Sequence, residues 1–262
     1  MSERSGYLAG TPSWVDVTTP DLDAAIKFYG DLFGWDIEKG GEEFGFYSMA
    51  SLRGKTVAGI GPMPPGSPAP PAWSTYLASD DAEATAKLAQ DAGATILMEP
   101  MQVGASGKMF YAIDPTGAGF GVWQAGEHTG AQLVNEPGTL CWNELHTPDV
   151  AKTEEFYGKL FPYQFEAVAD LPPGMDYSMF QVAGEGVAGR MPLDPESPAG
   201  AQSHWLSYFM VDDCDGATAR LAELGGTVLH EPVDAPYGRN SLVRDPWGAT
   251  FSLLQAPATQ PS

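Results

Sequence analysis

The sequence predicts an α+β fold made of two tandem modules, each containing short strands and two amphipathic helices. One pattern occurs twice, as WVDVTTPD from Trp14 and as WNELHTPD from Trp142. Further pairs follow in the same order, including KFYGDLFGW with EFYGKLFPY and DPTGAGFGVWQA with DPWGATFSLLQA. An internal repeat of this length indicates one structural unit present twice. The 31 Gly and 23 Pro residues favour many turns and short strands over long helices.

The first module shows the predicted order of elements, and the second repeats it. A strand is expected at 14–18, where side chains alternate in character. A helix follows, with Thr19 as the expected N-cap and Pro20 in the first helical position. Strands are expected in FGFYSMA and KTVAGIG. WSTYLAS then begins a second series of strand, helix, strand and strand, with a helix ending at Gly93 and a turn at DPTG.

The repeat boundaries predict two modules at residues 8–125 and 139–257, with a linker at 126–138. The formal charge of −21 makes phosphate backbones and anionic lipid poor partners, so neither nucleic acid nor membrane binding is expected. No signal peptide and no apolar run of about 20 residues is recognisable. The two cysteines, Cys141 and Cys214, lack paired spacing, which suits a reducing compartment. We expect a cytoplasmic protein, either a monomer or a homodimer.

Three repeated motifs, PDLDAAIKFYGDLFGW, ASDDAEATAKLAQDAGA and DPTGAGFGVWQ, resemble those of the vicinal oxygen chelate superfamily. That superfamily includes glyoxalase I, extradiol dioxygenases, fosfomycin-resistance proteins and bleomycin-binding proteins. The chain is more narrowly similar to two-module actinobacterial proteins labelled hydroxylases or glyoxalase-like proteins, some of which accompany aromatic polyketide pathways. The resemblance implies tandem βαβββ modules that form one curved mixed sheet, or cup, with the helices outside.

The resemblance also implies where a metal would bind, in the first and last strands of each module. The matching positions are Trp14 and Gly121 in the first module, and Trp142 and Ser252 in the second. Indole has no lone pair for a metal, glycine has no side chain, and a serine hydroxyl alone is a poor ligand. We therefore expect no metal and no cofactor at these positions.

Aromatic side chains stand where the family's ligands would be. We expect Trp14, Trp142 and Trp123 to line one cavity for a planar ligand, because aromatic contacts contribute about 0.5–1.5 kcal/mol each beyond buried area. Core packing is the alternative role for these tryptophans. The remaining residues predicted to bind the ligand are Gly121, Ser252, Met49, Met179 and Leu254.

Strand alternation places Asp16 beside Trp14, and Glu144 and His146 beside Trp142. The leading interpretation is a metal-free protein that binds a planar aromatic natural product or drug, for sequestration, resistance or support of a tailoring enzyme. The alternative is a cofactorless or metal-dependent enzyme of glyoxalase, lyase or hydroxylase type that uses these three residues, which also form the candidate relocated metal site. A third possibility is an interaction protein that keeps the fold without a ligand.

Overall fold

The computed structural model describes residues 2–64, 66–67, 69–169, 171, 176–193 and 202–257. The first half contains β1 (Pro12–Thr19), α1 (Leu22–Phe33), β2 (Asp36–Glu38), η1 (Glu42–Phe44), β3 (Ser48–Leu52), β4 (Lys55–Pro62), β5 (Trp73–Ala78), α2 (Ala82–Asp91), β6 (Thr95–Val103), β7 (Gly107–Ile113) and β8 (Gly119–Ala125). The second half contains β9 (Leu140–Thr147), α3 (Val150–Leu160), β10 (Gln164–Ala167), β11 (Ser178–Val182), β12 (Glu185–Pro192), β13 (His204–Met210), α4 (Cys214–Glu223), β14 (Thr227–Ala235), β15 (Gly238–Arg244) and β16 (Thr250–Gln255).

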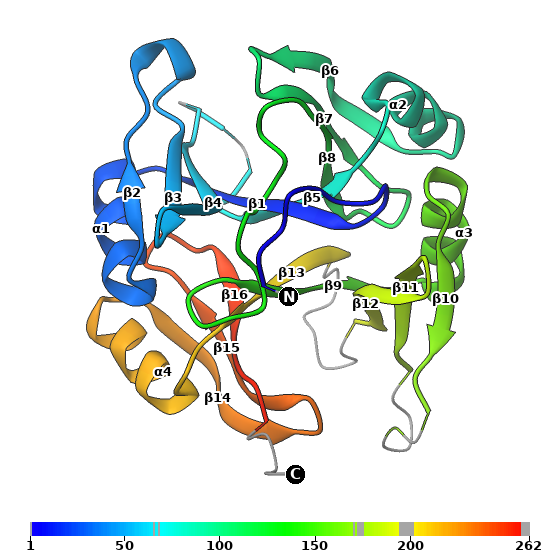
Figure 1. Ribbon diagram of the computed structural model, residues 1–262. Coiled ribbons are helices and arrows are strands. Elements are labelled where there is room, and N and C mark those ends of the chain that lie inside the picture. Colours follow the sequence, from blue (N-terminus) through cyan, green and yellow to red (C-terminus); the bar gives the residue numbers. More distant parts are fainter. Residues whose placement is uncertain are drawn as a thin grey trace.

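Each half forms its own eight-stranded mixed sheet (Figure 1). The first sheet has the order β2-β3-β4-β1-β5-β8-β7-β6, and the second has the order β10-β11-β12-β9-β13-β16-β15-β14. The α+β class and the tandem repeat are thereby confirmed. The expectation of one sheet shared by both modules was wrong. Because β1 pairs with β5, and β9 pairs with β13, each half joins two βαβββ units into a complete sheet of its own.

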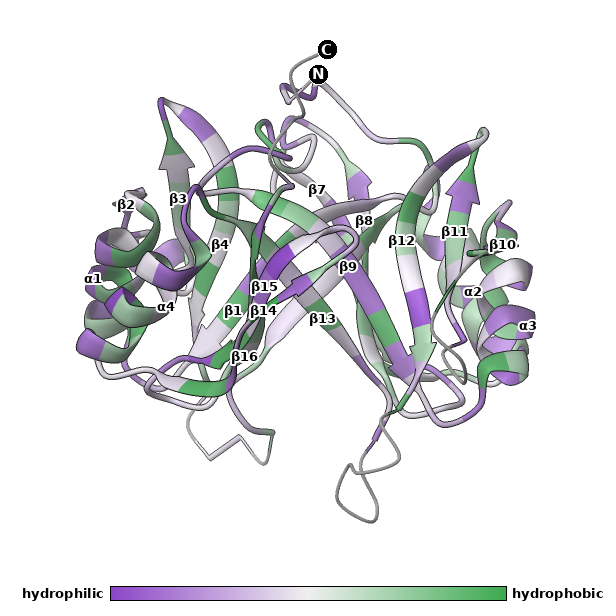
Figure 2. Ribbon diagram, turned by 90° about the horizontal axis from the view of Figure 1, so that it is seen from below, coloured by the Kyte–Doolittle hydropathy of each residue, from purple (hydrophilic) through white to green (hydrophobic). Residues whose placement is uncertain are grey.

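Helices from the two halves pack in pairs at the flanks of the sheets. Figure 2 shows α1 beside α4 on one side and α2 beside α3 on the other. The first core combines Tyr29 and Phe33 of α1 with Phe209 and Phe251 of the second sheet. The second core is likewise built from both halves. The halves therefore share their apolar interior. Among the described residues, no helix has the length and apolar character needed to cross a membrane.

Repeated motifs supply a matching pair of buried polar contacts between the halves. The Tyr29 hydroxyl donates to Asp245 Oδ2 at 2.8 Å, and the Tyr157 hydroxyl donates to Asp114 Oδ2 at 3.1 Å. Each tyrosine comes from a Phe-Tyr-Gly copy, and each aspartate comes from the Asp-Pro turn of the opposite half. Each half therefore holds the Asp-Pro turn of the other half through its own tyrosine.

Local signals determine where the helices begin and end. The N-cap of α1 is Asp21, whose Oδ1 accepts from the Ala24 N–H at 3.1 Å, so the expectation of Thr19 as the cap was wrong. Thr19 Oγ1 instead accepts from the Asp21 N–H, and Pro20 lies before the helix. The helix α2 ends at Asp91, and the expected stop at Gly93 corresponds to a turn with φ of 99°.

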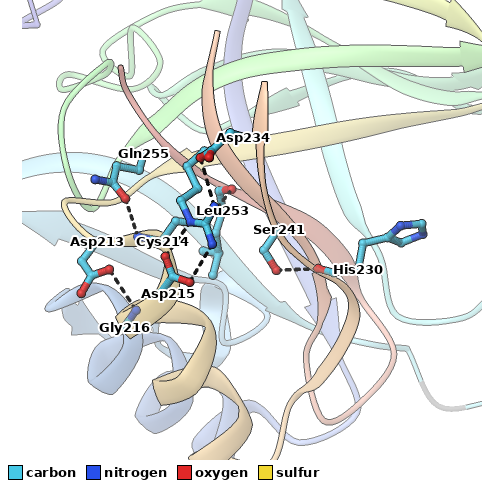
Figure 3. A network of polar contacts seen from close by, with 10 residues as sticks. Asp213, Cys214, Asp215, Gly216, His230, Asp234, Ser241, Leu253 and Gln255 are labelled. Carbon is cyan, nitrogen blue, oxygen red and sulfur yellow. Dashed lines mark hydrogen bonds and ion pairs between the residues drawn. The ribbon is translucent and has the colours of Figure 1, made fainter. Parts of the chain in front are cut away.

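Side chains also fix the start of α4 to the second sheet (Figure 3). Asp213 caps the helix, and Gln255 at the end of β16 accepts from the Cys214 N–H at 3.0 Å. Arg239 of β15 makes a bidentate contact with Asp215 at 2.6 and 2.9 Å. These contacts lie on the helical side of the second sheet and leave its other face to different residues.

Candidate functional site

Strand alternation divides each sheet into a face packed by helices and an opposite face, which we call the inner face. On β1, Val15 and Val17 enter the first core, while Trp14 belongs to a separate apolar cluster on the inner face. On β9, Leu145 enters the second core, and Trp142 joins a cluster on the inner face of the second sheet. The repeated tryptophans therefore face away from the helices in both halves.

A chain of hydrogen bonds follows the first of these tryptophans. The first cluster comprises Trp14, Asp16, Tyr47 and Tyr76. Trp14 Nε1 donates to the Tyr47 hydroxyl at 2.8 Å, and that hydroxyl donates to Asp16 Oδ2 at 3.0 Å. Burial raises the pKa of Asp16 to about 6, although hydrogen bonds from Tyr47 and Tyr76 act in the opposite direction. Asp16 is therefore a buried carboxyl group whose proton is held more tightly than usual.

The second cluster comprises Trp142, Glu144, Tyr177 and Tyr208, and it repeats this arrangement. Trp142 Nε1 donates to the Tyr177 hydroxyl at 2.8 Å. The Tyr208 hydroxyl donates to Glu144 Oε1 at 2.9 Å, and burial, together with the nearby charge of Glu144, raises the pKa of Tyr177. Both sheets thus hold an indole and a carboxyl group through two tyrosines.

Two glycines make room for the tyrosines that orient the indoles. Gly59 and Gly189 end the two copies of Val-Ala-Gly. A Cβ atom at Gly59 would collide with the Tyr47 hydroxyl, and one at Gly189 would collide with the Tyr177 hydroxyl. The repeated glycines are therefore part of the two clusters, because any side chain there would displace a tyrosine.

His146 extends the second cluster but not the first. Its Nε2 lies 2.8 Å from Glu144 Oε1, although the direction of the ring N–H does not suit a hydrogen bond. The His146 ring stacks on the His204 ring with centroids 4.9 Å apart. Burial is the main cause that lowers the pKa of His204. Of the predicted acid–base set, Glu144 and His146 come together, whereas Asp16 belongs to the other sheet.

The predicted ligand-binding residues divide in the same way. Trp14, Trp123 and Met49 lie in one apolar cluster of the first sheet. Trp142 and Leu254 lie together in the second sheet. Met179 contacts the same region, since a Cβ at Gly186 would touch both Met179 and Trp142. The expectation of one cavity lined by all three tryptophans was therefore wrong, because the strands carrying them close into separate sheets.

The positions expected to lie beside a ligand are filled by the chain itself. Gly121 pairs with Tyr76, and the Tyr76 ring lies so close that a Cβ at Gly121 would collide with it. Ser252 is 2% exposed, and its hydroxyl donates to the Ser241 carbonyl at 3.1 Å. The space beside Gly121, one of the predicted ligand-binding residues, is therefore occupied by a tyrosine ring of the protein.

These residues do not fit a metal centre of the kind that the resemblance implies. Gly121 offers no ligand atom and is covered by Tyr76, while the Ser252 hydroxyl is engaged by backbone. Throughout the described part of the chain, no group of three or more His, Cys, Asp or Glu side chains is arranged to hold a metal ion. The inner faces instead carry tyrosine–carboxyl networks.

The linker at 126–138 covers the inner face of the first sheet. Ala131 and Val134 pack in the same apolar cluster as Trp14 and Trp123. The His128 ring makes T-shaped contacts with both indoles, with centroids 4.4 Å from Trp14 and 5.4 Å from Trp123. Trp14 is consequently only 4% exposed. Trp142, its counterpart in the second sheet, is half-buried.

A cavity of about 200 Å³ borders this covered face. Its lining includes Tyr7, Ser13, Trp123 and Thr129, so strands, linker and N-terminal segment all contribute to its wall. Tyr7 also ties the N-terminal segment to the linker, because its hydroxyl donates to the Ala131 carbonyl at 2.5 Å. The linker is therefore anchored next to open space rather than embedded in continuous core.

Sequence reasoning missed the tyrosines of both clusters and the position of His128. Tyr47 and Tyr177 begin the two Tyr-Ser-Met copies, and Tyr76 and Tyr208 occupy matching places in WSTYLAS and WLSYFMV. Retention of tyrosine at both pairs of positions was the signal that pointed to them. His128 has no counterpart signal, because only the folded path of the linker brings it to the tryptophans.

Residues 11–122 and 139–253 match the family described as the Glyoxalase/Bleomycin resistance protein/Dioxygenase superfamily. "Putative glyoxylase CFP32" of Mycobacterium tuberculosis is 44% identical, covering 99% of this chain and 100% of the relative. The anthracycline biosynthesis protein DauV of Streptomyces sp. (strain C5) is 34% identical, covering 98% of this chain and 97% of the relative. The 2,3-dioxygenase LapB of Pseudomonas sp. KL28 shares the fold, with a TM-score of 0.64 and 14% identity over 98% of this chain and 97% of LapB. The chain therefore belongs to the glyoxalase, bleomycin resistance protein and dioxygenase superfamily.

Proposed function

We propose that this protein binds a planar aromatic small molecule on the inner face of its second sheet. The hydrogen bond from Trp142 to Tyr177 carries this proposal, because it fixes a half-buried indole in one orientation. A side chain that is already ordered loses little conformational entropy on binding. The entropy cost therefore cancels less of the favourable stacking free energy. Leu254 and Met179 supply apolar contact beside the indole.

Glu144 and His146 give the same surface a polar handle. Glu144 is 6% exposed and accepts from Tyr208, and the His146 imidazole lies beside it. A carboxylate accepts hydrogen bonds from hydroxyl groups, and an imidazole both donates and accepts according to its tautomer. The chemistry therefore suits an aromatic compound that carries phenolic hydroxyl groups near a fused ring system.

The relatives support this choice of ligand class. DauV is named an anthracycline biosynthesis protein. Anthracyclines have a planar, fused ring system with hydroxyl substituents. The ring system suits stacking on the indole, and the hydroxyl groups suit hydrogen bonding to the carboxyl group beside it. We propose that the protein holds such a compound as a sequestering factor or as an accessory to a tailoring enzyme.

A hydroxylated anthraquinone tests the proposal by quenching of tryptophan fluorescence and by calorimetric titration. Trp142→Phe is expected to weaken binding about tenfold, because the indole face and its bond to Tyr177 are both lost. Trp14→Phe is the matched control and is expected to bind as the wild type does, since His128 covers that indole. Equal affinity of the wild type and Trp142→Phe would contradict the proposal.

A second candidate function is proton transfer catalysed by Glu144 and His146. Their 2.8 Å contact is the observation that favours it, because a carboxyl group beside an imidazole is a common acid–base pair. The glyoxylase name of CFP32 suggests an assay with the hemithioacetal of methylglyoxal and a thiol. Glu144→Gln is expected to abolish turnover, whereas Asp16→Asn is expected to retain it. Turnover by Glu144→Gln at the wild-type rate would exclude this role.

A further inference from the structure

We propose that the first sheet contains a second ring-binding site, which the protein keeps filled with the imidazole of His128. The site is formed by Trp14 and Trp123, and it takes a small heteroaromatic ring once the imidazole is removed. This inference concerns the first sheet alone and does not depend on the ligand proposed for the second sheet.

The contacts of His128 are those that a bound ring would make. Its imidazole meets Trp14 at 86° between planes and Trp123 at 67°, so both contacts are edge-to-face. This geometry is favourable between aromatic rings, because the positive edge of one ring approaches the negative face of the other. Trp14 and Trp123 therefore form two walls of a site shaped for one flat ring.

The polar side of the contact is incomplete, which distinguishes it from ordinary core packing. His128 Nε2 is buried and has no hydrogen-bond partner among the described residues. Burial lowers the pKa of His128 to about 4, so the ring is neutral around pH 7. A buried nitrogen without a partner is unfavourable, so contact with the indoles must outweigh that penalty.

The backbone of the linker holds the imidazole in this position. Trp123 Nε1 donates to the His128 carbonyl at 2.8 Å. Farther along the linker, the Ala131 N–H donates to the Ser13 carbonyl at 2.8 Å, and Gln132 pairs with Thr56 at 2.8 Å. Before the ring, the Gly126 N–H donates to the Ser106 carbonyl at 2.8 Å, so the linker is held on both sides of His128. A tethered ring reaches a high effective concentration and excludes a free ring of similar affinity.

The equivalence of the two sheets explains why such a site exists. Both clusters hold their tryptophan through a tyrosine hydroxyl at 2.8 Å. The second sheet therefore repeats one wall of this site, the oriented indole, and carries Leu254 at the position that matches Trp123. In the first sheet the linker fills the site, and in the second sheet Trp142 remains half-buried. Of the two tyrosine-held indoles, Trp142 is therefore the more accessible one.

Chemical rescue by imidazole tests the inference. His128→Gly removes the ring and is expected to lower the melting temperature. At pH 8, 20 mM imidazole is then expected to raise the melting temperature of this variant by about 3–6 °C, if it binds with a dissociation constant of about 1 mM. The wild type and Glu127→Gly, a neighbouring exposed position, are expected not to respond.

His128→Phe keeps a ring in the site without the nitrogens. Its melting temperature is expected to be close to that of the wild type and to stay unchanged when imidazole is added. Two results would overturn the inference: a folded His128→Gly that imidazole does not stabilise more than the wild type, or a His128→Phe variant as unstable as His128→Gly. The second comparison remains decisive if His128→Gly does not fold. Either failure leaves the proposal for Trp142 standing, because imidazole rescue does not report on the second sheet.

Discussion

The hydroxyl of Tyr29 in the first half lies 2.8 Å from Asp245 of the second half, and both residues are buried. Tyr157 and Asp114 make the reverse contact at 3.1 Å. Burial raises the pKa of both tyrosines well above the usual value, and the neighbouring carboxylates add to this effect. Because each half completes the other's turn and both cores are shared, we expect the two halves to unfold as one unit.

Tyr29→Phe tests this coupling. The variant leaves a buried carboxylate oxygen of Asp245 without its donor, so the free energy of unfolding is expected to fall by about 1–3 kcal/mol. Urea unfolding followed by circular dichroism and by fluorescence measures it. Tyr237→Phe, at an exposed position, is the control and is expected to change stability by less than about 0.5 kcal/mol. Two separate unfolding transitions in the wild type would contradict the coupling.

Asp16 and His128 are expected to change the stability of the protein in opposite directions as the pH changes. The folded-state pKa of Asp16, about 6, exceeds its ordinary 3.8. Its contribution to stability is therefore present at low pH and lost as the pH rises through 6. The folded-state pKa of His128, about 4, lies below its ordinary 6.5. Its contribution is lost as the pH falls from 6.5 through 4. Between about pH 4 and pH 6 the two contributions to stability partly cancel.

Variants at the two positions separate these effects. In Asp16→Asn the response of His128 remains, so the free energy of unfolding is expected to fall by about 2–3 kcal/mol relative to wild type between pH 7 and pH 4. In His128→Phe the response of Asp16 remains. The free energy of unfolding of this variant, relative to that of the wild type, is therefore expected to fall as the pH rises from 4 to 7. Urea unfolding at several pH values checks both slopes. Parallel profiles for wild type and both variants would refute the assignment.

Gly189→Ala is expected to disturb the packing of Tyr177 and Trp142 in the second cluster. The new methyl group collides with the Tyr177 hydroxyl, so the tyrosine must move and Trp142 loses its acceptor. We expect a loss of about 1–3 kcal/mol in unfolding free energy and a shift in tryptophan emission. Gly6→Ala is the control, because nothing lies within 4 Å of the added atom. An unchanged emission spectrum in Gly189→Ala would argue against the packing seen here.

The sequence predicted the repeat, the helices and the face on which the tryptophans lie, because these follow from local periodicity and turn residues. It did not predict that each half closes its own sheet, because the pairing of β1 with β5 is a long-range contact without a local signature. The roles of Tyr47 and Tyr177 were hidden for a similar reason. Each depends on a glycine in a neighbouring strand, and that dependence becomes visible only when the strands are paired.

Tyr177→Phe and Tyr47→Phe form a matched pair for the proposed function. Each removes the acceptor of one indole N–H, from Trp142 and Trp14 respectively. Both are therefore expected to lower stability to a similar extent, by about 1–2 kcal/mol. Only Tyr177→Phe is expected to weaken binding of a hydroxylated anthraquinone, by about three- to tenfold, because only that indole belongs to the accessible surface. Parallel calorimetric titrations compare the two variants. Equal losses of affinity would mean that the ligand responds to general loosening of the fold, and an effect confined to Tyr47→Phe would move the site to the first sheet.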